Sequence, residues 1–182
     1  MIKVAAISYL NSIPFIYGLE NSNVYSDIIL SKDYPSRVAD SLLNDEVDIA
    51  LAPIVVLNEL KDYNVISEFC IGAESSVDSV CLYSHIPIEE IKTILLDYQS
   101  RTSVELLKLL LREYWDVNPT LVNSFSTNDF DIHDDRAALV IGDRSFILNG
   151  QYNYVYDLAE IWNLMTGLPF VFACWVTTKK IS

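Results

Sequence analysis

The sequence predicts an α/β protein of two lobes, each with a mainly parallel β-sheet flanked by helices. Apolar runs of strand length alternate with helical patterns along the whole chain, which is typical of parallel sheets covered by helices. Of the 182 residues, 51% are hydrophobic and 20% are charged, so the chain can bury a substantial core. No Gly/Ser-rich linker separates the halves. We therefore expect lobes joined by strand-like hinges, with the ligand cleft between them.

The first part of the chain predicts four strands separated by helices. Pro14, Pro35 and Pro53 each stand at a predicted helix start, where proline is favoured because that position needs no backbone N–H. The helix opened by Pro35 has its apolar residues at helical spacing, and the one opened by Pro53 is expected to run through Leu60. The expected strands are residues 2–7, 28–31, 47–51 and 65–71.

The second part is organised around a long, leucine-rich helix. Residues 102–115 place their leucines over a wide face, which favours a helix packed on a core. A further helix is expected over 157–165, before a last apolar strand at 168–175. The other expected strands are residues 77–83, 94–96, 121–122 and 137–141.

This order of elements predicts a discontinuous first lobe. We expect lobe 1 to consist of residues 1–76 with 172–182, and lobe 2 of residues 77–171. The sequence stops six residues after Val176, directly after a strand that looks buried. We therefore expect lobe 1 to be incomplete at its C-terminus, with a natural terminus and a truncated gene as the two alternatives.

Charge and cysteine usage restrict the partners and the compartment. Twelve Lys and Arg stand against 25 Asp and Glu, a net charge of −13, which excludes nucleic acid and disfavours an anionic membrane surface. Cys70, Cys81 and Cys174 form no CxxC pair and lie in apolar runs, as buried reduced thiols do. The N-terminal residues lack the cleavage pattern of a signal peptide. We expect a cytoplasmic protein without membrane or nucleic-acid partners.

Polar residues stand at two predicted helix N-termini, where free backbone N–H groups and the helix dipole favour anions. Asn11 and Ser12 lie between the first strand and the first helix. The second set precedes and opens the leucine-rich helix: Ser100, Arg101, Thr102 and Ser103. Plain helix capping is the alternative at both places. Arg101 offers a bidentate carboxylate partner, although an ion pair with Asp97 or Glu105 is a competing interpretation.

Other candidate motifs are weaker. The acidic stretch 128–136 contains Asp129 and His133, but it lacks the glycine and the distant glutamate of a calcium loop, which favours a solvated turn. Asp143 could act as a general base or as a helix cap. The sequence contains no GxSxG, HExxH, P-loop or GxGxxG motif. The residues alone thus indicate a two-lobed binder of a small, anionic ligand, with no metal site and no cofactor.

Several strings, taken in order, resemble one protein family. They are ISYLNSIPF (7–15), VDIALAPI (47–54), SVCLYS (79–84), DYQSRTSVELL (97–107), LVIGDRS (139–145) and YDLAEIWNLMTGLPFVFACW (156–175). They are similar to chorismate dehydratase, the first enzyme of the futalosine route to menaquinone, which has the type II periplasmic-binding-protein fold. The resemblance covers essentially the whole chain. It implies a hydro-lyase that converts chorismate to 3-[(1-carboxyvinyl)oxy]benzoate and water.

The resemblance also implies roles for individual residues. Asn11 is expected to be the catalytic residue, fixing the reactive conformer through its amide. The expected substrate-binding residues are Ser12, Ala52, Pro53, Ile54, Ser79, Ser100, Arg101, Thr102, Ser103 and Gly142. Among these, Thr102 and Ser103 are expected to bind a substrate carboxylate through their backbone N–H groups.

The absence of a base from these motifs carries its own implication. A sister enzyme of the same pathway and fold, which makes 1,4-dihydroxy-6-naphthoate, has a histidine at the position of Gly142. The resemblance therefore favours a substrate-assisted elimination, in which the enolpyruvyl carboxylate of chorismate removes the proton. A non-catalytic anion-binding protein of the same fold and the sister synthase are the alternatives. A homodimer is compatible with the sequence.

Overall fold

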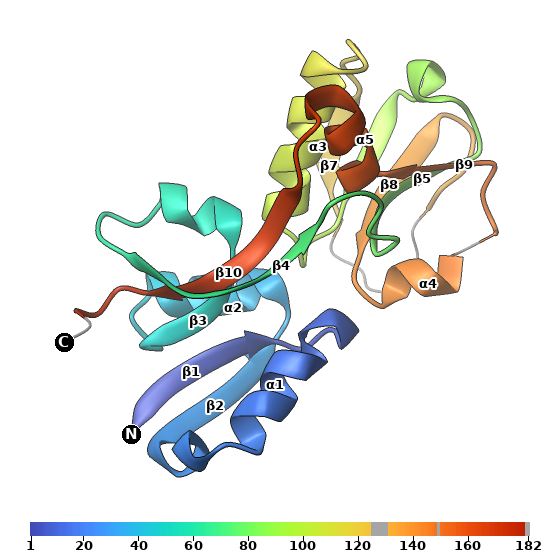
Figure 1. Cartoon of the computed structure of the whole chain (residues 1–182). Helices are drawn as coiled ribbons and strands as arrows, with labels where there is room; N and C mark the ends of the chain where they lie inside the picture. Colours follow the sequence, from blue (N-terminus) through green and yellow to red (C-terminus); the bar gives the residue numbers. More distant parts are fainter. Residues whose placement is uncertain (125–130, 149, 181–182) are drawn as a thin grey trace. The chain divides into compact units, whose positions relative to one another are not determined.

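The structure is a computed structural model, and it describes residues 1–124, 131–148 and 150–180. The chain divides into two compact units (Figure 1). Unit 1 is formed by Met1–Gly72 together with Val171–Ser182, and unit 2 by Ala73–Phe170. Each unit is an α/β structure around its own five-stranded sheet, as the sequence predicts.

Unit 1 contains a sheet with the strand order β2-β1-β3-β10-β4. Its strands are β1 (Ile2–Ile7), β2 (Ile28–Asp33), β3 (Ile49–Pro53), β4 (Asn64–Ala73) and β10 (Phe170–Thr177). Its helices are α1 (Ile13–Glu20) and α2 (Pro35–Leu43), with 3-10 turns η1 (Leu10–Ser12), η2 (Asn23–Asp27) and η3 (Ile54–Asn58). Strand β1 is parallel to both β2 and β3, whereas β10 runs antiparallel to β3.

The core of unit 1 follows from the helical spacing of α2. Val38, Ala39 and Leu42 are almost fully buried, at 0–1% exposure, on the helix face that contacts β3 and β1. Removing such side chains from water stabilises the unit by roughly 1.5–3 kcal/mol for each leucine or valine. On β10, Trp175 packs edge-on against Phe15 of α1, with ring centroids 5.9 Å apart.

Unit 2 contains a second sheet with the strand order β7-β6-β8-β5-β9. Its strands are β5 (Val80–Ser84), β6 (Thr93–Leu96), β7 (Thr120–Asn123), β8 (Arg136–Ile141) and β9 (Tyr154–Asp157). Its helices are α3 (Thr102–Glu113), α4 (Arg144–Leu148) and α5 (Leu158–Thr166), with the 3-10 turn η4 (Ile88–Glu90). Strands β7 and β8 are parallel to β6, while β8 and β9 are antiparallel to β5.

Helices α3 and α5 pack side by side in unit 2 (Figure 1). The buried leucines of α3 form the apolar face that its spacing predicts: Leu106, Leu107, Leu110 and Leu111. Helix α5 has well-defined ends. Asp157 accepts hydrogen bonds from the backbone N–H groups of Ala159 (2.9 Å) and Glu160 (3.1 Å). Gly167, at φ 71°, ends the helix in the left-handed region that glycine adopts without strain.

The structure refines several predicted elements. Each sheet is mixed, because β10 and β5 run against their parallel neighbours. The helix expected from Pro53 through Leu60 is the short 3-10 turn η3, whose first residues are β-branched and disfavour an α-helix. The predicted strand 77–83 begins only at Val80, because the N–H groups of Val77 and Asp78 donate to Asp157 instead.

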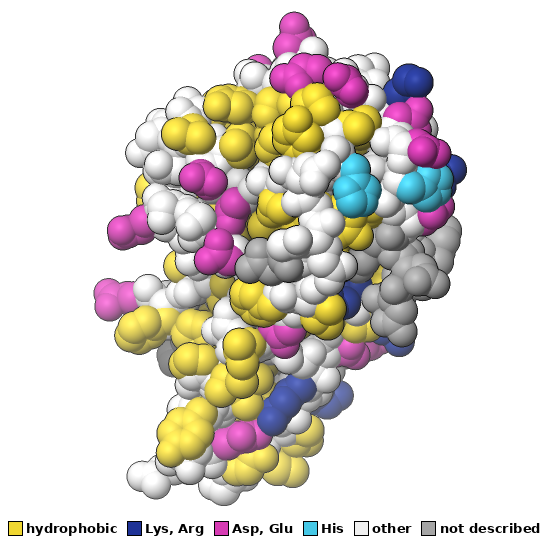
Figure 2. Space-filling view, turned by 90° about the vertical axis from the view of Figure 1, so that its right-hand side faces the viewer, with side chains coloured by type: hydrophobic (Ala, Val, Ile, Leu, Met, Phe, Trp, Pro, Cys, Tyr) yellow, Lys and Arg dark blue, Asp and Glu magenta, His cyan; other side chains and the backbone are white. Residues whose placement is uncertain are grey.

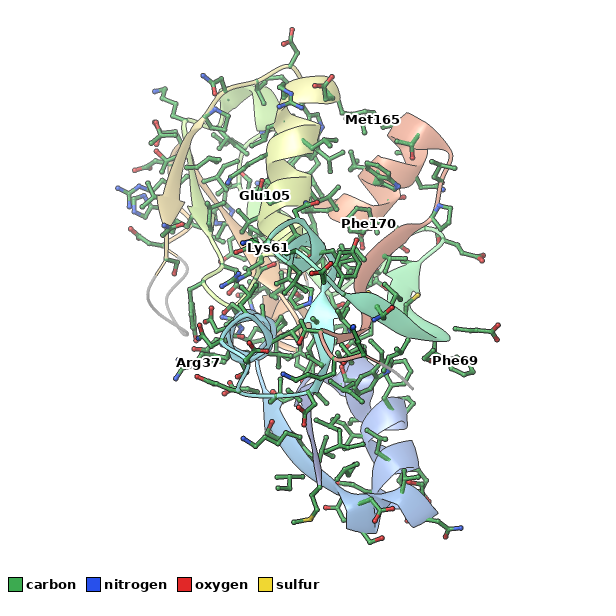
Figure 3. All side chains as sticks on the ribbon, turned by 90° about the vertical axis from the view of Figure 1, so that its left-hand side faces the viewer. Arg37, Lys61, Phe69, Glu105, Met165 and Phe170 are labelled. Atoms are coloured by element: carbon green, nitrogen blue, oxygen red, sulfur yellow. The ribbon has the colours of Figure 1, made fainter. Side chains whose placement is uncertain are left out.

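The cysteines differ in environment. Cys81 and Cys174 are buried as expected, and burial raises the pKa of Cys81 to about 12 and also raises that of Cys174. The expectation of a buried thiol is wrong for Cys70, which is exposed on β4, the edge strand of its sheet. Its neighbour Phe69 extends away from the strand and is 70% exposed (Figure 3). An apolar run on an edge strand therefore does not imply burial.

Candidate functional site

In unit 1, the predicted site residues gather at one edge of the sheet. Strands β1 and β3 are parallel neighbours, with Ala5 opposite Ala50, so their carboxyl ends lie at the same edge. Asn11 and Ser12 follow β1 within η1. Two of the other predicted residues end β3 and one begins η3: Ala52, Pro53 and Ile54. The carboxyl edge of parallel strands is where ligands bind in open α/β sheets, so this edge is the candidate site of unit 1.

Asn11 presents an exposed polar side chain at this edge, and its amide accepts a hydrogen bond that favours one orientation. Ser12 is fully buried, and its hydroxyl donates to Oδ1 of Asn11 over 3.3 Å. The amide of Asn11 thus presents its Nδ2 group as a donor. The buried hydroxyl of Ser12 thus has Asn11 as its hydrogen-bond partner.

Two backbone N–H groups at this edge, those of Ser12 and Ile13, have partners within the chain. The N–H of Ser12 donates to the carbonyl of Tyr9 over 3.0 Å, and that of Ile13 donates to the carbonyl of Leu10. Pro14 has no N–H to offer. These two N–H groups are therefore engaged within the chain, whereas the side chain of Asn11 is exposed at this edge.

In unit 2, the predicted residues also meet at one edge of the sheet. The segment 97–103 follows β6, and Gly142 follows the parallel strand β8. Ser79 precedes β5, which runs antiparallel to β8, so it reaches the same edge. The N–H of Gly142 donates to the carbonyl of Ser79 over 2.8 Å, and Gly142 has a φ of 68°, which favours glycine. Both residues are buried.

At the start of α3, the polar residues cap the helix. The hydroxyl of Ser100 accepts from the N–H of Ser103 over 3.1 Å, so this amide, predicted to bind a carboxylate, already has a partner. Thr102 and Ser103 are buried, whereas Ser100 and Arg101 are half-buried. The alternative of plain capping thus describes Ser100 and Ser103. A ligand at this edge would meet Ser100 and Arg101 before the buried pair.

A pair of charged residues at this edge escaped the sequence interpretation. The carboxylate of Asp97, considered above as a partner for Arg101, pairs with Arg144, three residues after β8. Glu105, the other partner considered, projects from α3 and pairs with Lys108 over 2.7 Å (Figure 3). No local signal links Asp97 to Arg144, because 47 residues separate them and only the pairing of β6 with β8 brings them together.

Metal binding finds no support in the described ranges 1–124, 131–148 and 150–180, in which no group of three or more His, Cys, Asp or Glu side chains is placed to hold an ion. Asp129 lies outside the described residues. Asp131 contacts both His133 (2.8 Å) and Arg136 (2.6 Å), all on the surface. This arrangement is that of a solvated turn.

The described helices include none with the length and the apolar character that a bilayer span requires. A sequence model of a family described as "Menaquinone biosynthesis" matches residues 2–182, which is nearly the whole chain. The chain belongs to this family. Membership in the menaquinone biosynthesis family agrees with the resemblance that the ordered strings indicate.

Solved structures show how widely the fold of this menaquinone biosynthesis protein is shared. Protein AF1704 from Archaeoglobus fulgidus is similar with a TM-score of 0.74 at 14% identity, covering 100% of this chain and 69% of that one. The effector-binding domain of QuiR, in complex with shikimate, gives a TM-score of 0.57 at 13% identity and covers 100% and 88%. A periplasmic substrate-binding protein of an ABC transporter from Coxiella burnetii gives 0.53 at 9% identity and covers 98% and 85%. The predicted type II periplasmic-binding-protein fold is confirmed.

Proposed function

We propose that this protein is a chorismate dehydratase, a hydro-lyase that acts in menaquinone biosynthesis by the futalosine route. The observation that carries the proposal is the exposed amide of Asn11, oriented by buried Ser12 at the carboxyl edge of β1 and β3, in a chain of the menaquinone biosynthesis family. The product is 3-[(1-carboxyvinyl)oxy]benzoate. Chorismate is its small-molecule substrate, and no cofactor takes part.

The elimination of water from chorismate requires the protein mainly to position the substrate. The proton on ring carbon 3 is removed, its electron pair forms the new ring double bond, and the hydroxyl on carbon 4 leaves as water after taking up a proton. The ring becomes aromatic, which supplies much of the driving force. The protein then has to hold the ring in the conformer from which elimination is possible, and a well-placed amide achieves this by donating to and accepting from substrate oxygens.

Each unit has, at its own candidate edge, a polar group suited to an oxygen of an anionic substrate. In unit 1, this group is the donor Nδ2 of Asn11. In unit 2, Arg101 and the Ser100 hydroxyl are suited to a carboxylate, because a guanidinium forms strong bidentate hydrogen bonds with it. The shikimate bound by the QuiR domain is a hydroxylated cyclohexene carboxylate, so this fold accommodates a ligand of that class.

The enolpyruvyl carboxylate of chorismate serves as the base in this proposal. The two histidines of the chain, His85 and His133, are exposed and are visible on the surface in Figure 2. Neither belongs to the candidate residues at the two sheet edges. By the resemblance given above, Gly142 corresponds to a histidine of the sister synthase, which supports a dehydratase over that enzyme.

Substrate assistance predicts that Asp143→Asn retains activity. Asp143 is the exposed carboxylate next to Gly142 and is therefore the protein group closest in sequence to a base position. We expect kcat for chorismate to stay within about threefold of the unaltered protein, because no proton passes through this side chain. Steady-state kinetics across pH 6–9 measures this. Loss of turnover in a folded variant that still binds chorismate would identify Asp143 as the base and refute substrate assistance.

Incubation of the purified protein with chorismate, followed by mass spectrometry, tests the proposed function. We expect a product lighter than chorismate by one water, with the ultraviolet absorption of a substituted benzoate. Chorismate that stays intact but raises the melting temperature of the protein would indicate an anion-binding protein. Intact chorismate with no thermal shift would refute the proposal altogether.

A further inference from the structure

The strongest group outside the proposed roles is an ion pair buried beneath the candidate edge of unit 2. The side chain of Asp97 is fully buried at the end of β6, and that of its partner Arg144 is only 19% exposed. The carboxylate of Asp97 accepts from the N–H groups of Gln99 (3.0 Å) and Ile141 (3.0 Å) as well as from Nη2 of Arg144. One carboxylate thus links the turn after β6, the end of β8 and the start of α4.

Arg144 also contacts the next residue of the same turn. Its guanidinium carbon lies 5.8 Å from the ring centroid of Tyr98, within the range of a cation–π contact. The hydroxyl of Tyr98 in turn accepts from Nε2 of Gln99 over 2.7 Å. Arg144 therefore holds two consecutive residues of the turn, one by charge and one by its planar face.

The ion pair is connected to the candidate binding residues by short hydrogen bonds. The carbonyl of Asp97 accepts from the N–H of Ser100 over 3.1 Å, and the Ser100 hydroxyl caps the N–H of Ser103. On its other side, the pair holds Ile141, the residue before Gly142. A shift of Asp97 would therefore move Ser100 and the first turn of α3 together.

A contribution to folding stability does not by itself explain why the ion pair of Asp97 and Arg144 is buried. Burying two charges costs several kcal/mol, which their attraction only offsets when the geometry is good, so buried ion pairs contribute little net stability. Strand β8, which precedes Arg144 in the chain, offers a comparison, because Arg136 at its start pairs on the surface with Asp131 over 2.6 Å. The surface pair of Arg136 and Asp131 contacts no candidate residue. The buried pair of Arg144 and Asp97 instead contacts the turn that contains Ser100 and Arg101.

We propose that Arg144 is a positioning residue, which acts through Asp97 and Tyr98 to fix the segment 97–103 for binding a substrate carboxylate. This inference rests on the proposed function for its kinetic consequence. Its structural part, the immobilisation of the first turn of α3 by Arg144, is independent of the substrate.

The test compares Arg144→Ala with Arg136→Ala, which removes the arginine at the start of β8, whereas Arg144 begins α4 after that strand. We expect Arg144→Ala to lower kcat/KM for chorismate by about 100-fold, the effect of misplacing a binding group by about 1 Å. Arg136→Ala is expected to stay within about threefold. Guanidinium ion at millimolar concentration should restore part of the activity of Arg144→Ala, compared with sodium at equal ionic strength. Arg144→Lys, which keeps the charge but not the planar face, should lose less activity.

Amide hydrogen exchange of the substrate-free variants provides a readout that does not need turnover. We expect the Ser103 N–H to exchange faster in Arg144→Ala, with α5 unchanged, and Arg144→Lys serves if the alanine variant does not fold. Faster exchange with unchanged kinetics would overturn the positioning role, and so would a kinetic loss with unchanged exchange, because Arg144 would then contact the substrate itself. If the unaltered protein leaves chorismate intact, the proposed function fails, whereas the exchange comparison still decides whether Arg144 fixes the turn.

Discussion

Asn11→Ala is expected to lower kcat/KM for chorismate by about 1,000-fold, which is the order of effect seen when one preorganised donor is removed from an active site. Its amide is exposed at the carboxyl edge of β1 and β3, and Ser12 fixes its orientation. Truncation removes both the donor and the acceptor that would hold the substrate conformer. Single-turnover kinetics, followed by the appearance of the aromatic product, measures the loss.

Two further variants control for this result. Asn21 lies at the other end of α1, is exposed, and donates to the carbonyl of Tyr17 over 2.9 Å. Asn21→Ala removes an exposed amide just after α1, whereas Asn11 lies in η1 just before that helix, and it should leave turnover unchanged. Ser12→Ala should give an intermediate loss of about tenfold, because the amide stays but loses its fixed orientation. Turnover by Asn11→Ala within tenfold of the unaltered protein would contradict a catalytic role for this residue.

The largest expected effect on stability is that of Asp157→Ala. The buried carboxylate of Asp157 caps α5 through Oδ1, and its Oδ2 accepts from the N–H groups of Val77 (2.8 Å) and Asp78 (2.6 Å). Alanine leaves these four N–H groups without this acceptor, which costs about 2–4 kcal/mol. Thermal unfolding should show a melting temperature lower by about 10 °C.

Asp134→Ala is the matched control for this prediction. The Asp134 side chain is 89% exposed and contacts His133 on the surface, and its φ of 50° favours Asp over Ala, so Asp134→Ala should lower the melting temperature by no more than about 4 °C. Asp157→Asn should fall between the two, since the amide keeps one acceptor oxygen but turns a donor toward the other pair of N–H groups. Equal melting temperatures for the alanine variants of Asp134 and Asp157 would contradict the role given to Asp157.

The elements that could be predicted from sequence are those with a strong local pattern. Pro35 and the helical spacing behind it locate α2, and the leucines of α3 locate the longest helix. Strand β9 was missed because its polar and aromatic residues, Tyr154–Asp157, have no apolar alternation and form a strand only by pairing with β5. The five-residue helix α4 is too short for its periodicity to be read.

The residues of the candidate site likewise divide into those that the sequence predicts and those that only the structure identifies. Asn11 and the segment 100–103 could be located because each follows a predicted strand, and the ends of parallel strands meet at one edge. The roles of Ser12 and Ser100 as partners of neighbouring groups depend on side-chain geometry, which a pattern of polar residues does not encode. The pairing of Asp97 with Arg144 depends on the order of strands in the sheet, so it could be found only in the structure.

The position of β10 sets the order in which the molecule can be completed during synthesis. This strand lies between β3 and β4, yet it comes from the end of the chain. While the ribosome is still adding residues 73–170, β10 has not yet been synthesised. Strand β4 then has no neighbour in the sheet, and the side chain of Trp175 is absent from the core of unit 1. Unit 2 is continuous in sequence, so all of its strands have left the ribosome before β10, the last strand of unit 1, is available. Because domains form as soon as their residues are available, the segment that begins synthesis finishes folding last.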